Sequence, residues 1–163
     1  MSNLYCLDAN VLIQPWNNYY SPSLCPNFLD ILSELVDGNV IFCTSEVQRE
    51  ILKEDDALSE WIKAHPSFVH EINEDVQIKL REVLSQFPYL VNATKDRSMG
   101  DPWVIAHAWS LNATVVTSEI KSNSVKRVKI PDVCEHFNVR YIDVFKFLEE
   151  VGISFDAKVN IKK

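Results

Sequence analysis

The chain has 163 residues, of which 47% are hydrophobic and 24% charged, and its formal net charge is −7. This composition is globular rather than disordered, and the length predicts a single domain over residues 1–163. No apolar run approaches the roughly 18 to 20 residues that cross a bilayer. No basic segment with a cleavage site begins the chain, so we expect a cytoplasmic protein without a membrane anchor.

The cysteines bear on whether the protein binds zinc, and the charge distribution bears on whether it binds nucleic acid. No CxxC pair is present, which argues against a zinc knuckle, and Cys6 and Cys43 are expected to be small buried hydrophobes in a reducing compartment. A negative net charge argues on average against a nucleic-acid partner. That argument is weak here, because acids that hold metal ions add to the negative count. The distribution of charge also says more than its sum, and the basic residues concentrate late in the chain, from Lys121 onward.

The first apolar run ends at an acidic residue. Residues 4–7 and 11–13 flank Asp8, which predicts a short buried strand followed by a turn. Residues 14–26 contain prolines with several Asn and Ser, and they are expected to form a loop. We expect its aromatic side chains to pack over the core, with stacking on nucleobases as the alternative; they are Trp16, Tyr19 and Tyr20.

From residue 27 to residue 88 the apolar spacing predicts helices separated by short strands. The expected elements are a helix ended by Gly38, a strand over residues 40–43, a helix capped by Thr44 or Ser45, a helical pattern up to Pro66, a weak strand at residues 68–69, and an amphipathic helix from Asn73 or Glu74 to Phe87.

The same alternation continues after residue 100. The expected elements are a helix opened by Asp101 and Pro102, a buried strand over residues 113–116, a short helix around residues 133–137, a strand over residues 140–142, and a helix over residues 144–151. Short apolar strands that alternate with helices predict a parallel sheet covered on both faces. We therefore predict an α/β fold.

Four acidic residues stand at the ends of apolar runs or near the beginnings of helices: Asp8, Glu50, Asp101 and Glu119. The carboxyl ends of parallel strands meet at one edge of a sheet, which is where ligands bind in open α/β folds. Carboxylates gathered there repel one another unless a cation neutralises them, and hard oxygen ligands suit Mg²⁺ or Mn²⁺. Taken singly, each acid could instead cap a turn or a helix or face the solvent.

If the acids converge, they could hold one or two divalent ions that activate water and stabilise charge on a phosphoryl oxygen. Asn10 and Thr117 are then expected to orient the acids or a bound water. His107 is expected to face away from the site. An aspartyl phosphatase with Asp8 as nucleophile is disfavoured, because Asn10 stands where that chemistry usually places a second acid.

The sequence around these acids resembles four motifs of PIN-domain nucleases, in the same order and with similar spacing over nearly the whole chain. The stretches are LDANVLI around Asp8, VQREI around Glu50, GDPWVIAHA around Asp101 and VVTSE around Glu119. Residues 129–134, KIPDVC, resemble one branch of bacterial PIN proteins of unassigned function.

The resemblance implies a PIN-like three-layer α/β/α fold with a central parallel sheet of about four to five strands. It also implies a Mg²⁺- or Mn²⁺-dependent ribonuclease similar to VapC-like toxins, in which the four acids bind the metal and Thr117 supports them. The partners that the resemblance implies are an RNA substrate, a cognate antitoxin protein and a second copy of the chain in a homodimer. Residues 14–26 and 121–129 are expected to contact substrate, in particular Lys121, Lys126 and Arg127.

Two residues leave alternatives open. The fourth acid of the resemblance is commonly Asp, and Glu119 is one methylene longer, which could weaken activity or leave an inactive PIN-like scaffold that binds RNA or a protein. Glu46 competes with Glu50, because the two are one helical turn apart on the same face. Glu50 is preferred because it alone fits the spacing of the second motif.

Overall fold

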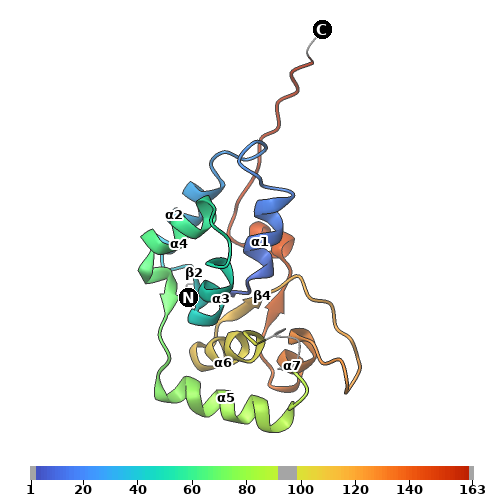
Figure 1. The fold of residues 1–163 in the computed structure, drawn as a ribbon. Coiled ribbons are helices and arrows are strands. Elements are labelled where there is room, and N and C mark those ends of the chain that lie inside the picture. Colours follow the sequence, from blue (N-terminus) through green and yellow to red (C-terminus); the bar gives the residue numbers. More distant parts are fainter. Residues whose placement is uncertain (1–2, 92–98, 162–163) are drawn as a thin grey trace.

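The computed structural model describes residues 3–91 and 99–161, and these form a five-stranded sheet with helices on both faces (Figure 1). All paired neighbours are parallel, and the strand order is β3-β2-β1-β4-β5. The strands are β1 (Tyr5–Leu7), β2 (Ile41–Thr44), β3 (Val69–His70), β4 (Thr114–Val116) and β5 (Tyr141–Ile142). The predicted α/β class and parallel sheet are confirmed.

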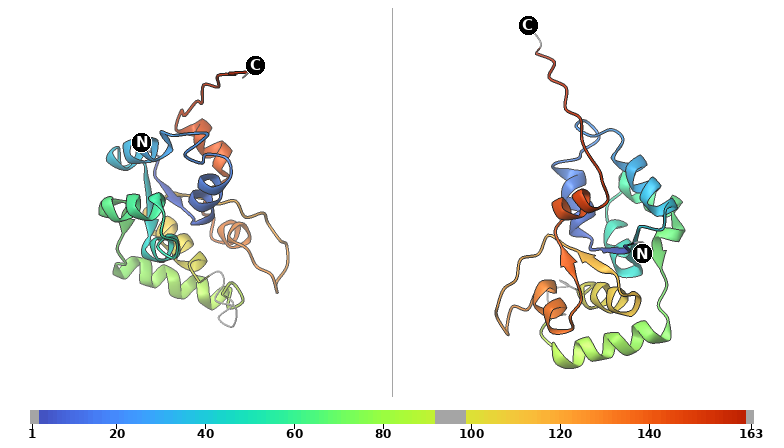
Figure 2. Two further views of the ribbon diagram at one scale, coloured as in Figure 1. Left: turned by 45° about the horizontal axis from the view of Figure 1, so that its top comes forward. Right: turned by 180° about the vertical axis from the view of Figure 1, so that it is seen from behind.

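The helices divide between the two faces of the sheet, as Figures 1 and 2 show. Helices α1, α2 and α8 lie on one face, and α6 and α7 lie on the other, with α5 packed outside α6. This division follows from right-handed crossovers, because the chain moves outward from β1 to β3 and then returns to β4 and β5. The helices are α1 (Asn10–Asn17), α2 (Phe28–Asp37), α3 (Ser45–Ile51), α4 (Ala57–Ala64), α5 (Glu74–Gln86), α6 (Asp101–Leu111), α7 (Ile130–His136) and α8 (Val144–Glu150), with a short 3₁₀ helix at Pro66–Phe68.

The central strand is buried on both faces. Tyr5, Cys6 and Leu7 are each at most 2% exposed, as expected for a parallel strand between two helical layers. The cysteines at positions 6, 25, 43 and 134 are buried and free, which agrees with the predicted role of Cys6 and Cys43 as packing residues. Across the described ranges, the helices are all too short or too polar to cross a membrane.

The first helix corrects the sequence-based prediction. Residues 11–13 are helical rather than part of a strand and turn, and the helix continues through Pro15 to Asn17, where a loop was expected. Burial outweighs the local cost of an internal proline, because Pro15 and Trp16 face the core and Trp16 packs against Phe28 with ring centroids 6.3 Å apart.

The aromatic residues of this region mostly pack, as expected. Tyr20 stacks on Phe28 and on Phe155, with centroid distances of 5.5 and 4.8 Å. Tyr19 is 62% exposed and so does not fill the core. The packing interpretation is therefore correct for Trp16 and Tyr20.

The cap predicted at Thr44 or Ser45 is made by Thr44, and Asn73 caps the helix that was predicted to begin at Asn73 or Glu74. The Thr44 hydroxyl accepts a hydrogen bond from the Val47 backbone N–H at 3.3 Å, and the Asn73 amide oxygen accepts one from Val76 N–H at 2.9 Å. These caps satisfy N–H groups that the first helical turn leaves unpaired. The first of them sets the direction of α3 as it leaves the carboxyl end of β2.

Candidate active site

Asp8 leaves the sheet at the carboxyl end of its central strand. Its backbone N–H donates to the Val116 carbonyl at 3.0 Å, so Asp8 extends the ladder between β1 and β4 by one residue. The neighbours of β1 are β2 and β4, whose connections run on opposite faces of the sheet. A crevice opens at such a switch point, and it is the usual ligand site in this class of fold.

The Asp8 carboxylate is buried and hydrogen-bonded. It is 7% exposed, Oδ2 accepts from the Thr117 hydroxyl at 2.9 Å, and Oδ1 accepts from the Ala9 backbone N–H at 2.8 Å. Burial raises the pKa of Asp8 from 3.8 to about 7, and the nearby charges of Glu119 and Glu50 add to this rise against the two hydrogen bonds. A cation beside Asp8 would relieve this penalty.

Glu119 is held from two sides. Its Oε1 lies 3.0 Å from the Lys129 ammonium, and its Oε2 accepts from the Ile130 backbone N–H at 2.9 Å. The Glu119 backbone N–H donates to the Thr117 hydroxyl oxygen at 3.1 Å. The Thr117 hydroxyl therefore connects Asp8 with the segment that carries Glu119.

The other two acids approach the same region from α3 and α6. Glu50 is exposed on α3, and its charge contributes to the raised pKa of Asp8. Asp101 is in the first turn of α6, and its charge contributes, after that of Glu119, to the raised pKa of Lys129. The charges of Glu119 and Glu50 thus act on Asp8, and those of Glu119 and Asp101 act on Lys129.

Glu46 lies at the junction of α3 and α6. A Cβ added at Gly100 would lie 3.5 Å from the Glu46 Cβ, so the first turn of α3 touches the start of α6. The Glu46 carboxylate pairs with Arg49 at 2.8 Å, and its side chain is 16% exposed. Glu46 therefore has a partner of its own in α3, and the choice of Glu50 as the site acid stays a prediction.

Asn10 acts on the backbone of the site rather than on an acid. Its side-chain oxygen accepts from the Ser118 backbone N–H at 3.2 Å and from the Ser118 hydroxyl at 3.0 Å. These bonds join the start of α1 to the segment after β4. Of the two predicted supporting residues, Thr117 contacts Asp8 directly and Asn10 fixes the segment between Thr117 and Glu119.

The carboxylate oxygens of the candidate site are of the chemical kind that binds a hard divalent cation. Carboxylate oxygens are the ligands that Mg²⁺ and Mn²⁺ prefer, and the buried Asp8 is surrounded by further negative charge. In the part of the chain that the structure describes, no group of three or more His, Cys, Asp or Glu is close enough to hold a metal ion. Glu119 is engaged with Lys129 instead, so metal binding requires the acids to draw together.

Lys129 is a site residue that the sequence analysis did not single out. It was only part of the range 121–129 expected to contact substrate, whereas Lys121, Lys126 and Arg127 were named. The sequence signal for Lys129 is that residues 129–134 resemble one branch of PIN proteins.

Asp132 organises the loop that leads to Lys129. Its carboxylate accepts from the backbone N–H groups of Ser122, Asn123 and Lys129 at 3.2, 3.1 and 2.9 Å, and from the Ser122 hydroxyl at 2.9 Å. Burial alone would raise the pKa of Asp132, but these hydrogen bonds hold it below its ordinary value. The loop is therefore tied to the first turn of α7.

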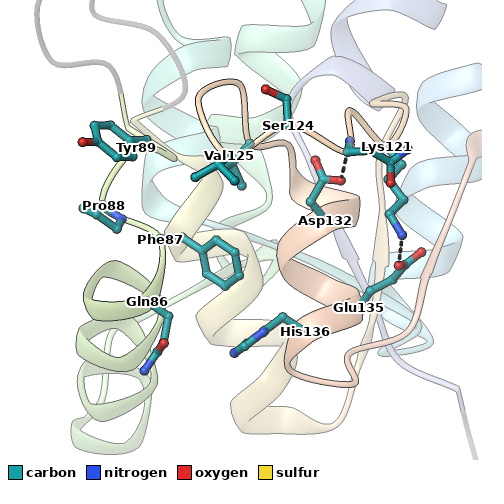
Figure 3. Close-up of a pocket in the computed structure, with 12 residues that line it drawn as sticks. Gln86, Phe87, Pro88, Tyr89, Lys121, Ser124, Val125, Asp132, Glu135 and His136 are labelled. Atoms are coloured by element: carbon teal, nitrogen blue, oxygen red, sulfur yellow. Dashed lines mark hydrogen bonds and ion pairs between the residues drawn. The ribbon is translucent and has the colours of Figure 1, made fainter.

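The residues predicted to contact substrate lie along this loop. Lys121 pairs with Glu135 at the side of a pocket of about 690 Å³, and Phe87, Tyr89 and Val125 also line it (Figure 3). The pocket is on α7 and the end of α5, so Lys121 is directed toward α7 rather than toward the acids.

Lys126 and Arg127 are exposed beyond the pocket, at a turn closed by the Arg127 N–H and the Ser124 carbonyl at 3.4 Å. Their role in substrate contact stays a prediction.

His107 lies in the core, away from the solvent. It is 1% exposed, and its Nε2 has no hydrogen-bond partner among the described residues. Burial, and then the neighbouring His70, lowers the pKa of His107 to about 4, so the ring is neutral at physiological pH. The ring lies beside Phe42 of β2, at a centroid distance of 6.4 Å.

Replacing Thr117 with valine should weaken the site without emptying it. The change removes the donor to Asp8 and the acceptor of the Glu119 N–H, so the pKa of Asp8 should rise further. Groups that orient metal ligands typically contribute about 10- to 100-fold in activity. If the site cleaves RNA with a bound metal ion, as the resemblance to PIN-domain nucleases implies, we expect a loss of this size for Thr117→Val and near-normal cleavage for Thr117→Ser. Equal rates for Thr117→Val and the unaltered protein would contradict the prediction.

Comparison with known proteins identifies the family and the fold. The fold is similar to that of a chain in the structure of VapBC-1 from nontypeable Haemophilus influenzae, with 16% identity and a TM-score of 0.53 over 86% of this chain and 97% of that chain. A chain in the structure of VapBC2 from Rickettsia felis bound to a promoter DNA fragment is 20% identical, with a TM-score of 0.49 over 86% of this chain and 98% of that chain. The first likeness confirms the predicted PIN-like fold.

No curated protein matches the sequence significantly. A family model described as a domain of unknown function (DUF4411) matches residues 5–155, and the chain therefore belongs to the DUF4411 family.

Proposed function

We propose that this protein is a divalent-metal-dependent ribonuclease, and that it is the toxin of a toxin–antitoxin pair. The observation that carries the proposal is the position of Asp8, a buried carboxylate at the switch point of a PIN-like sheet with the charges of Glu50 and Glu119 around it. A scaffold without a ligand would lose stability by placing like charges there. The VapBC likeness adds support for the toxin assignment at the level of the fold.

The proposed roles follow from where each residue lies. Asp8 would hold Mg²⁺ or Mn²⁺ together with Glu50, Asp101 and Glu119, and Thr117 would keep the Asp8 carboxylate oriented through its hydrogen bond. A divalent ion in such a site supplies an acidified water and neutralises charge on the phosphoryl oxygen.

The surroundings of the acids indicate how RNA, an antitoxin and a second copy of the chain would bind. The loop of residues 121–129 carries the exposed Lys126 and Arg127 and reaches the acids at Lys129, and its positive charge would attract an RNA backbone despite the negative net charge. An antitoxin would bind the same acids through a basic side chain. Self-association into a homodimer is part of the proposal, and its interface would have to avoid the carboxyl edge of the sheet.

A second candidate is an inactive PIN-like scaffold that binds RNA or a protein. The specific observation that favours it is the engagement of both Glu119 carboxylate oxygens by Lys129 and Ile130. Those contacts compete with a metal ion for the lone pairs of both Glu119 oxygens.

Cleavage of a mixed RNA pool separates the two candidates. The purified protein should cut RNA with Mg²⁺ or Mn²⁺ and should be inactive with a chelator, because the acids alone cannot activate water. Asp101→Asn should lower the rate by about 100-fold or more if Asp101 binds the metal. Calorimetry should show Mn²⁺ binding that Asp101→Asn weakens. RNA binding without cleavage or metal binding would instead establish the scaffold.

A further inference from the structure

Among the described residues, the Lys129 ammonium is a cation that pairs with one of the site acids. The Lys129 ammonium lies 3.0 Å from Glu119 Oε1, and the charge of Asp101 also acts on it. The Lys129 side chain is 43% exposed, so it is accessible to solvent while its ammonium contacts Glu119. An ammonium carries three N–H donors, and a single carboxylate oxygen does not use them all.

The position of Lys129 is fixed from both sides of the residue. Its backbone N–H donates to Asp132 at 2.9 Å, and the next residue, Ile130, donates its N–H to Glu119 at 2.9 Å. The residue is therefore tied to α7 and to the site at once. Lys126 and Arg127, by contrast, lie at an exposed turn. A cation held in this way loses little conformational freedom when it binds a ligand.

An acidic site that acts on a polyanion has an electrostatic difficulty. The same carboxylates that attract a metal ion repel the phosphates of RNA, and the chain as a whole carries a net charge of −7. A fixed ammonium at the mouth of the site would offset this repulsion where the phosphate arrives. A lysine acts on phosphate as a compact point charge, so it need not make a bidentate contact.

We propose that Lys129 binds a backbone phosphate of the RNA at the acidic site, and that Glu119 positions Lys129 for this contact. The inference rests on the proposed ribonuclease function and deepens it by naming a substrate-binding residue. It also gives Glu119 a role that its longer side chain suits, because Glu119 reaches both the Lys129 ammonium and the start of α7.

RNA binding tests the proposal without relying on cleavage. The probe is a fluorescently labelled single-stranded oligoribonucleotide, and binding is measured by anisotropy in the Asp8→Asn background over a range of salt concentrations. We expect Lys129→Gln to weaken binding by about 10-fold and to reduce the slope of log K against log salt by about 0.7, the value for one phosphate contact in a single strand. Lys129→Arg should restore most of the binding, because it keeps the charge.

Lys63 provides the matched control. It is also a partly exposed lysine, paired with Glu60 at 2.6 Å, but it is on α4. Lys63→Gln should leave both the affinity and the salt slope unchanged. A thermal melt of each variant confirms that the comparison concerns folded protein.

The role of Glu119 is tested by a double-mutant cycle. Glu119→Gln should weaken RNA binding when Lys129 is present and should not weaken it in the Lys129→Gln background, because the favourable effect of Glu119 acts through Lys129. Binding that is indifferent to Lys129→Gln would overturn this proposal and leave the ribonuclease function standing. No RNA binding by any variant or by the unaltered protein would overturn both.

Discussion

Replacing Asp8 with asparagine should abolish metal-dependent cleavage and at the same time make the folded protein more stable at neutral pH. Cleavage should fall by about 100-fold or more, because the variant loses the most buried of the predicted ligands. Stability should rise because Asp8 is buried with a pKa raised from 3.8 to about 7. Function and folding therefore place opposite demands on this residue.

The way the free energy of unfolding depends on pH shows why Asp8→Asn should stabilise the protein. A carboxyl group with a raised pKa keeps its proton in the folded state, so unfolding releases that proton and the free energy of unfolding falls as pH rises from about 4 to about 7. Asparagine carries no charge at any pH. The stability gain of Asp8→Asn should thus be small at pH 4 and reach up to about 4 kcal/mol at pH 8, at 1.36 kcal/mol per unit.

Urea denaturation at pH 4, 6 and 8 in the presence of a chelator measures this gain. The matched control is Asp37→Asn, an exposed acid on α2, for which the difference in unfolding free energy should stay near zero at all three values. A variant Asp8→Asn that is no more stable than the original protein at pH 8 would show that Asp8 is not held in a costly ionised form.

Replacing Asp132 with alanine should have the second large effect. The carboxylate accepts four hydrogen bonds from the loop, three of them from backbone N–H groups. Hydrogen bonds to a charged group contribute about 1.5 to 3 kcal/mol each and are not additive, so we expect a loss of about 3 kcal/mol in unfolding free energy. RNA binding should also weaken, because Lys129 loses its backbone anchor.

Thermal unfolding and RNA binding should therefore change together in Asp132→Ala. Asp132→Asn, which keeps one acceptor oxygen, should lie between it and the unaltered protein. Glu149→Ala removes an exposed acid paired with Lys146 on α8 and should change neither property by more than about 0.5 kcal/mol. If Asp132→Ala lowers stability and leaves RNA binding intact, the loop does not position Lys129.

The features that the sequence predicted well are those with local causes. An apolar run followed by an acid predicts a strand that ends in a carboxylate, and Asp8 lies where this pattern placed it. The same holds for the Thr44 cap, since a hydroxyl before a helical period is a local signal.

The features that the sequence did not predict depend on distant contacts. The local signal of Pro15 favours a loop, but the burial of Trp16 against Phe28 outweighs it and extends α1. The pairing of Glu119 with Lys129 could not be read from spacing, because it depends on the loop conformation that Asp132 imposes.

The pairing of β1 with β4 has a consequence for when the candidate site can form during synthesis. Asp8 and Thr117 are 109 positions apart in the chain, yet they share one hydrogen bond. During synthesis the first strand is complete long before the ribosome has made the strand beside it, and contacts of such sequence separation form slowly. A nascent chain that ends before Thr117 lacks the partner that holds Asp8, so the site assembles late in translation, after most of the chain has emerged.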